Sequence, residues 1–179
     1  MRVGLVRHFR VKKDIPKQLL ISQSEVLRWF EEYDHADIEE GTVDLGNIDW
    51  KRCYASKLDR AVRTAHIIYP GNVEKRKELR EIQIYPFFKR DVKLPFLLWA
   101  VLVRMALLLD HKSQLERKTD VNMRIQKVLD EVLSHEEDVL IVGHGALMIF
   151  MRKELLRRGF RGPNLKTPKN GKLYLFEKE

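Results

Sequence analysis

Cysteine is nearly absent from this sequence of 179 residues, in which Cys53 is the only one. A lone cysteine cannot form an internal disulfide, so the sequence argues against a disulfide-stapled scaffold and favours a reducing compartment. The first residues also lack the apolar core of a secretory signal peptide. We therefore expect a cytoplasmic protein.

Hydrophobic runs of membrane-spanning length are absent as well. The most apolar segment, residues 94–109 (LPFLLWAVLVRMALLL), is shorter than the roughly 20 residues that a spanning helix needs, and Arg104 interrupts it. A buried helix or a lid is the favoured interpretation. An interfacial helix is the alternative, because Trp99 and the neighbouring cations suit a bilayer surface. Stable insertion into a membrane is not expected.

Acidic residues are outnumbered: 34 Lys and Arg against 26 Asp and Glu give a formal net charge of +8. This balance favours anionic partners through the long-range field of the protein. The sequence shows no aromatic-basic interleaving or known motif typical of nucleic-acid binding, and many cations lie on ordinary helix faces. We expect a phosphorylated small molecule or a phosphoprotein as the partner and no nucleic acid. The oligomeric state is not indicated.

Predicted strands alternate with predicted helices along the chain. The strands cover residues 2–7, 52–56, 138–144 and 172–178. The helices cover residues 22–33, 58–69, 96–109, 114–134 and 146–159, the first of which opens with a capping box of Ser22 and Glu25. This alternation predicts one α/β domain over residues 1–179, a three-layer α/β/α sandwich with a mostly parallel sheet.

Two of the apolar strands end in a histidine. His8 follows the first strand, and His144 follows the apolar run VLIVG. Ligands of open α/β sheets bind at the carboxyl ends of strands, so we expect both histidines to face one crevice. Ser56 lies at the end of the strand at 52–56, and Arg60 lies in the first turn of the helix that follows. Each residue alone is a weak signal, because a histidine at a strand end is more often structural.

The whole set, in its order, resembles the histidine phosphatase superfamily, the phosphoglycerate mutase-like proteins. LVRHF is similar to the family's opening Arg-His-Gly motif, and YASKLDRAVRTA to its Ser-x-x-x-Arg-Ala-x-x-Thr-Ala segment. LREI resembles its Leu-x-Glu acid segment, and VLIVGHGALM its second-histidine motif. The matches extend from residue 3 to residue 148.

The resemblance implies a phosphatase that hydrolyses phosphate monoesters through a phosphohistidine. His8 would be the nucleophile, and Arg7, Arg60 and His144 would hold the phosphoryl oxygens. Glu81 would donate a proton to the leaving group. The family needs no metal or other cofactor for this chemistry, and the sequence offers no convincing metal cluster.

Elementary electrostatics agrees with these roles. The guanidiniums of Arg7 and Arg60 supply fork-shaped pairs of donors that suit phosphoryl oxygens as acceptors. Their positive charge also keeps His8 neutral. A bound phosphate dianion raises the pKa of Glu81, which can then act as an acid. The turn at 143–145 leads into a helix whose free N–H groups would favour an anion.

Phe9 departs from the family, which usually has glycine after the histidine. Positive φ is costly for phenylalanine, so we expect an ordinary φ with the ring directed away from the phosphate. Phe9 would then line the mouth of the pocket and meet the organic part of the substrate, with Arg10, Lys12 and Lys13 around it. A weakly active, altered pocket is the alternative.

Residues 85–109 form a candidate lid that selects the substrate, with a plain core helix as the alternative. Its apolar members close to the acid segment are Pro86, Phe87, Phe88, Phe96 and Trp99. Of these, Trp99 joins Phe9 and Lys13 as a candidate substrate-binding residue.

Three other functions remain open. A phosphomutase of the same family is the nearest, although the short segment between Glu81 and His144 leaves little room for an elaborate cap. A catalytically weak module that binds a phosphorylated ligand is the second, and a basic nucleic-acid binder is the third. Ser56 and Thr64 are expected to be structural. The sequence does not identify the substrate.

Overall fold

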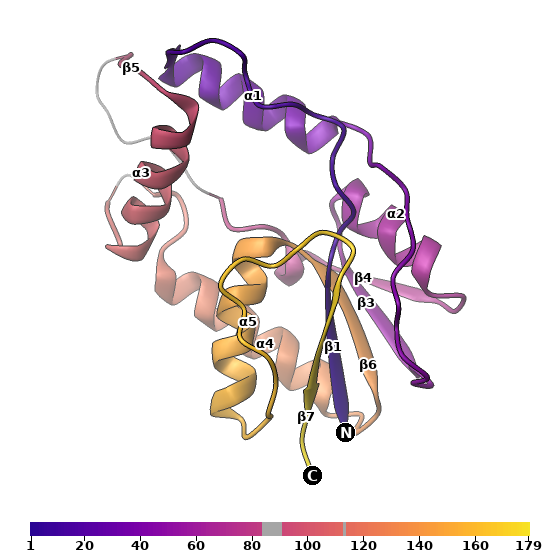
Figure 1. The fold of residues 1–179 in the computed structure, drawn as a ribbon. Coiled ribbons are helices and arrows are strands. Elements are labelled where there is room, and N and C mark those ends of the chain that lie inside the picture. The colour runs from indigo at the N-terminus through magenta and orange to yellow at the C-terminus, as the bar shows by residue number, and fades with distance from the viewer. Residues whose placement is uncertain (84–90, 113) are drawn as a thin grey trace.

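The computed structural model describes residues 1–83, 91–112 and 114–179. At its centre lies a five-stranded sheet of order β4-β3-β6-β1-β7 (Figure 1). Its strands are β1 (Arg2–Arg7), β3 (Arg52–Ser56), β4 (Val73–Arg76), β6 (Val139–Gly143) and β7 (Leu173–Glu177). The pairs β1–β6, β3–β6 and β3–β4 are parallel, and β7 runs antiparallel to β1. The predicted, mostly parallel sheet is confirmed.

Helices cover both faces of this sheet, because side chains along its inner strands alternate between two cores. On β6, Ile141 belongs to the core shared with α4 (Lys118–Leu133) and α5 (Gly145–Arg157). Its neighbours Leu140 and Val142 belong to the core shared with α2 (Asp59–Ile68). The molecule is therefore the predicted three-layer sandwich (Figure 1).

Two further helices lie beyond the carboxyl ends of the parallel strands (Figure 1). They are α1 (Gln23–His35) and α3 (Phe96–Leu108), joined by a small antiparallel pair, β2 (Ile21–Ser22) with β5 (Lys93–Leu94). The capping box of Ser22 and Glu25 at the start of α1 is confirmed. Within the described residues, no helix is long and apolar enough to cross a membrane.

The predicted elements are all present, with small shifts at their ends, but several short ones were missed. Strand β4 has the sequence VEKR, with a single apolar residue, and forms because it pairs with β3. The two-residue strands β2 and β5 and the 3-10 helix Lys77–Leu79 also lack a sequence signal of their own. The predicted helix at 114–134 begins only at Lys118.

Candidate active site

The parallel pairing of β1 and β6 brings His8 and His144 together. Arg7 lies in register with Gly143, and the backbone N–H of His8 donates to the Gly143 carbonyl at 3.0 Å. The two imidazole rings then follow from adjacent strand ends, with 5.1 Å between their centroids and an interplanar angle of 60°. His8 is 2% exposed and His144 is 0% exposed. Residues far apart in sequence thus form one buried pair.

The His8 ring is oriented by the main chain. Its Nδ1 lies 2.6 Å from the carbonyl oxygen of Phe9. A carbonyl oxygen only accepts hydrogen bonds, so Nδ1 carries the hydrogen and Nε2 keeps its lone pair. Burial, followed by the positive charge of Arg60, lowers the pKa of His8 to about 3. His8 is therefore neutral near pH 7, with Nε2 available as a nucleophile.

Arg7 and Arg60 supply two guanidiniums next to these rings. Arg7 donates from Nη1 to the carbonyl of Pro168 at 2.8 Å. A Cβ on Gly145 would lie 3.3 Å from its Cζ, so glycine at this position leaves room for the guanidinium. Arg60, from the first turn of α2, donates from Nη1 to Asp34 at 2.9 Å. Among the described residues, each guanidinium thus donates hydrogen bonds through a single nitrogen, Nη1.

Several buried nitrogen atoms of this cluster have no hydrogen-bond partner among the described residues: Arg7 Nε, Arg60 Nε and both ring nitrogens of His144. Buried polar atoms in proteins are nearly always hydrogen-bonded, so unpaired ones need a physical reason. Both arginines also lower the pKa values of both histidines, which places the four groups within one electrostatic environment. The cluster is suited to a small anion with several acceptor oxygens.

His144 is also uncharged. It is the N-cap residue of α5, and its burial, followed by the proximity of His8, lowers its pKa far below the usual value. A neutral imidazole can donate a hydrogen bond from one nitrogen and accept one at the other.

Glu81 lies against the N-terminus of α5. Its Oε1 accepts from the backbone N–H groups of Ile82 at 3.0 Å and Leu147 at 3.2 Å, and its Oε2 from Ala146 at 3.4 Å. The N–H groups of Ala146 and Leu147, two of those expected to favour an anion, are therefore engaged by Glu81. Burial raises the pKa of Glu81, and these backbone N–H groups oppose the rise.

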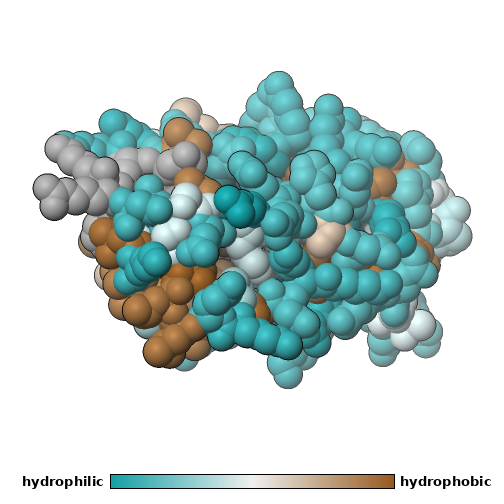
Figure 2. Space-filling model, turned by 90° about the horizontal axis from the view of Figure 1, so that it is seen from above, coloured by the Kyte–Doolittle hydropathy of each residue, from teal (hydrophilic) through white to brown (hydrophobic). Residues whose placement is uncertain are grey.

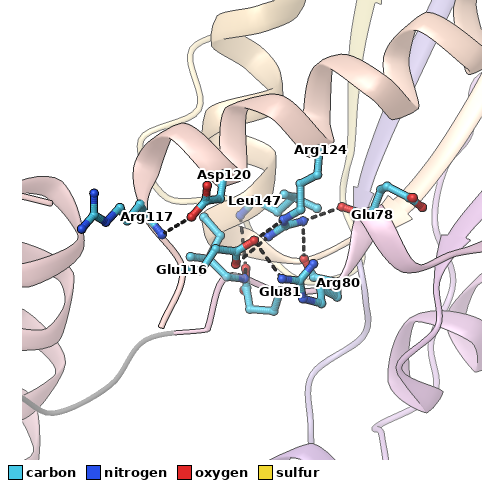
Figure 3. A network of polar contacts seen from close by, with 9 residues as sticks. Glu78, Arg80, Glu81, Glu116, Arg117, Asp120, Arg124 and Leu147 are labelled. Atoms are coloured by element: carbon cyan, nitrogen blue, oxygen red, sulfur yellow. Dashed lines mark hydrogen bonds and ion pairs between the residues drawn. The ribbon is translucent and has the colours of Figure 1, made fainter. Parts of the chain in front are cut away.

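A buried ion pair supports the segment that carries Glu81 (Figure 3). Arg124, on α4, bonds the carboxylate of Glu116 through two nitrogens. It also donates from Nη1 to the carbonyls of Glu78 and Arg80, the latter at 3.0 Å. Sequence reasoning missed this pair. The available signal was a charged residue among the apolar, helically spaced positions of α4.

Comparison with known proteins places the chain in a family. A model of the histidine phosphatase superfamily (branch 1) matches residues 35–178, a range that includes Arg60, Glu81 and His144. The chain belongs to this superfamily. The match begins after His8, whose position is instead set by the pairing of β1 with β6. The sequence matches none of the curated proteins with which it was compared.

Solved structures share the fold of this chain at low sequence identity. A mycobacterial glucosyl-3-phosphoglycerate phosphatase is 16% identical, with a TM-score of 0.61 over 99% of this chain and 90% of the other. The alpha-ribazole phosphatase of Shigella flexneri is also 16% identical, with a TM-score of 0.59 over 100% and 91%. YhfR of Bacillus stearothermophilus is 17% identical, with a TM-score of 0.58 over 99% and 91%.

Phe9 and Trp99 do not lie where the sequence suggested. Phe9 has an ordinary φ, as the sequence predicted. The residue is only 4% exposed, however, and it packs with Val11 and Ile38 in a core. Trp99 is 0% exposed, and its Nε1 donates to the Ile21 carbonyl. Phe9 is therefore used in packing, which corrects the expectation that it lines the mouth of the pocket. The burial of Trp99 agrees with the alternative of a core helix.

Lys13 lies in a surface groove of about 490 Å³ that also includes Arg10, Trp29 and Tyr33. Its ammonium pairs with Glu32. Tyr33 links this groove to the cluster of buried histidines and arginines described above, because the Arg60 guanidinium lies 5.4 Å from the centroid of the Tyr33 ring. The lid residues Pro86, Phe87 and Phe88 lie outside the described residues.

Two buried hydroxyls have local hydrogen bonds. Ser56 accepts from the Leu58 N–H at 3.3 Å. Thr64 accepts from the Phe9 N–H at 3.0 Å and donates to the Arg60 carbonyl at 2.7 Å, so it ties the chain after His8 to α2. In the part of the chain that the structure describes, no three His, Cys, Asp or Glu side chains gather as metal ligands.

Proposed function

We propose that this protein is a phosphatase that hydrolyses phosphate monoesters through a phosphohistidine on His8. The observation that carries the proposal is the neutral His8 beside the unpaired buried nitrogens of Arg7, Arg60 and His144. Similar structures include phosphatases named for phosphorylated small molecules. We extend that substrate class, a phosphorylated small molecule, to this chain.

The first step transfers the phosphoryl group to His8. Its Nε2 attacks phosphorus, an N–P bond forms, and the P–O bond to the leaving group breaks. The guanidiniums of Arg7 and Arg60 neutralise the charge on the equatorial oxygens, and His144 donates a hydrogen bond to one of them. Each of these three groups has a nitrogen that no other described residue bonds.

Glu81 supplies the proton that the leaving oxygen needs. Its Oε1 accepts two N–H groups at 3.2 Å or less, whereas Oε2 has only the 3.4 Å contact with Ala146. Oε2 is therefore the oxygen that carries the proton, since a protonated oxygen is the poorer acceptor. Burial already raises the pKa of Glu81, and a bound phosphate raises it further.

The second step returns His8 to its starting state. The Glu81 carboxylate takes a proton from water, the water oxygen bonds to phosphorus, and the N–P bond breaks. Inorganic phosphate leaves, with Nε2 of His8 again unprotonated. The two arginines and His144 stabilise the phosphoryl oxygens in both steps, and we propose that turnover is metal-independent.

The cysteine content bears on the cellular compartment of the protein. Cys53 is the only cysteine of the sequence and is buried, so it cannot form an internal disulfide, as is usual for proteins of a reducing compartment. We propose a cytoplasmic enzyme, which fractionation of the native cell would test.

The decisive experiment traps the phosphoenzyme. The full chain, mixed with a labelled aryl phosphate and quenched in alkali, should retain acid-labile label on His8. His8→Asn should lose both label and turnover, and the exposed His35→Asn should keep both. Turnover should persist in a chelator. Label in His8→Asn would overturn the mechanism, and tight phosphate binding without turnover in the native chain would replace the phosphatase with a binding module.

A further inference from the structure

Helix α3 packs against the domain along one side only. Trp99, Val103, Ala106 and Leu107 are buried on that side. The opposite side carries no polar stripe, although a surface helix of a soluble domain normally has one. The exposed side of α3 is thus apolar as well.

The exposed apolar residues of α3 form one continuous stripe. Leu97, Val101 and Leu108 recur at helical spacing and are 69%, 54% and 53% exposed. Leu98, Met105 and Leu109 broaden the stripe. Figure 2 shows a hydrophobic area gathered on this part of the surface, whereas most of the rest of that view is hydrophilic. Single exposed leucines are ordinary, but a contiguous patch marks an interaction surface.

A second segment with exposed apolar residues lies near the start of the stripe. Ile21 pairs with Leu94 in the antiparallel β2–β5 ladder, which brings the residues before Ile21 close to the start of α3. Leu19 is 83% exposed and Leu20 is 50% exposed. The α3 patch is defined here as Leu19, Leu20, Leu97, Leu98, Val101, Met105, Leu108 and Leu109.

Cations border the α3 patch. Lys93 precedes α3, and Lys112 follows it; both are exposed. At about 100° per residue, Arg104 projects at one edge of the stripe, beside Leu97. The nearby acids Asp91 and Asp110 already accept hydrogen bonds from Ser24 and from the backbone N–H of Lys118.

We propose that the α3 patch docks on an anionic lipid surface, with α3 lying in the plane of the interface. Leucines of the stripe would enter the acyl boundary, while Arg104 and the two lysines meet the headgroups. A two-fold contact between copies is disfavoured, because it would bring the same cations toward each other. The net charge of +8 favours approach to the same surface. This inference does not depend on the phosphatase proposal.

Vesicle binding by the full chain tests the proposal. Vesicles of neutral phosphatidylcholine are compared with vesicles that contain about 30 mol% phosphatidylserine, a strongly anionic mixture. We expect binding to the anionic vesicles that is at least about tenfold tighter than to the neutral ones and that weakens with salt. Equal affinity for both vesicles, or no binding to either, would overturn it.

Variants assign the binding to the α3 patch. Leu97→Glu with Val101→Glu should lower the partition coefficient about tenfold or more, and Arg104→Glu should lower it on anionic vesicles only. Met123→Glu, at an exposed apolar position on α4, is the matched control and should bind as the native chain. Circular dichroism checks that each variant folds. A concentration-dependent dimer that Leu97→Glu abolishes, without vesicle binding, would assign the patch to a second copy and reject the lipid proposal.

Discussion

Arg124 and Glu116 form a buried two-point ion pair. The guanidinium donates from Nε to Oε1 at 2.6 Å and from Nη2 to Oε2 at 3.2 Å, and the two residues are only 9% and 4% exposed. The remaining nitrogen of the guanidinium, Nη1, donates hydrogen bonds to the carbonyl oxygens of Glu78 and Arg80. The pair therefore ties α4 to the segment 78–80, which leads directly into Glu81. We infer that Arg124 positions the proposed acid without touching the substrate.

Replacement of Glu81 sets the reference for this inference. Glu81→Gln keeps the shape of the side chain and removes the transferable proton. We expect hydrolysis of an alkyl phosphate to slow by about 10² to 10⁴, the usual contribution of a general acid. An aryl phosphate, whose leaving group needs little protonation, should slow much less. Equal losses on both substrates, measured as kcat, would remove Glu81 from this role.

Arg124→Lys should reproduce the same pattern in a weaker form. Lysine keeps the charge next to Glu116 but cannot bond both of its oxygens and the two carbonyls at once. The loss should again be larger for the alkyl phosphate than for the aryl phosphate, and it should nearly vanish in a Glu81→Gln background. Lys127→Met, which removes an exposed partner of Glu78 on the same helix, is the control. A loss that is equal for both substrates would mean that Arg124 serves stability alone.

The contrast between these residues and the histidines shows what the sequence could predict. His8 and His144 each end an unbroken apolar strand, so local pattern alone places them at one sheet edge. Arg124 donates to carbonyl groups that are 44 and 46 residues away in the sequence. Glu81 accepts from backbone N–H groups that are 65 and 66 residues away. Such pairs depend on how the layers pack. Phe9 was misplaced for the same reason, because the glycines that make room for its ring, Gly41 and Gly171, lie in distant loops.

The two buried histidines predict acid-sensitive stability. An unfolded histidine titrates near pH 6.5, whereas His8 in the folded chain has a pKa of about 3 and that of His144 is also lowered. Below about pH 6.5 the unfolded chain binds more protons, so the free energy of unfolding falls as the pH falls toward 3. Each histidine contributes a slope of about 1.4 kcal/mol per pH unit in that window.

Urea unfolding at several pH values between 4 and 7 measures this slope. His8→Asn should remove the share of one histidine, and so should His144→Asn. His35 is exposed, and His35→Asn should leave the slope as it is in the native chain. An unchanged slope in both buried-site variants would contradict the assignment of the acid sensitivity to this pair.

Thr64 should matter through its hydroxyl. Thr64→Val preserves the shape of the side chain but leaves the buried Phe9 N–H without an acceptor, which costs about 1–3 kcal/mol of unfolding free energy. Because the Phe9 carbonyl orients His8, turnover should fall as well. Thr64→Ser keeps the oxygen and should recover most of both losses. If Thr64→Val and Thr64→Ser have the same free energy of unfolding in urea, the hydrogen bond from the Phe9 N–H makes no net contribution to stability.

Phe9 provides the sharpest distinction between a core residue and a substrate contact. Its ring packs beside Val11 and Ile38, and a Cβ on Gly171 would lie 3.0 Å from it, so the space around it is filled. Phe9→Gly should therefore lower the free energy of unfolding by about 3–5 kcal/mol through the cavity it leaves. Phe9→Leu, which refills most of that volume, should cost much less. Neither variant should change the order of kcat/KM across a panel of phosphorylated metabolites, because the ring is used in packing with Val11 and Ile38. A changed order in a Phe9→Leu protein of near-native stability would instead place the ring at the substrate.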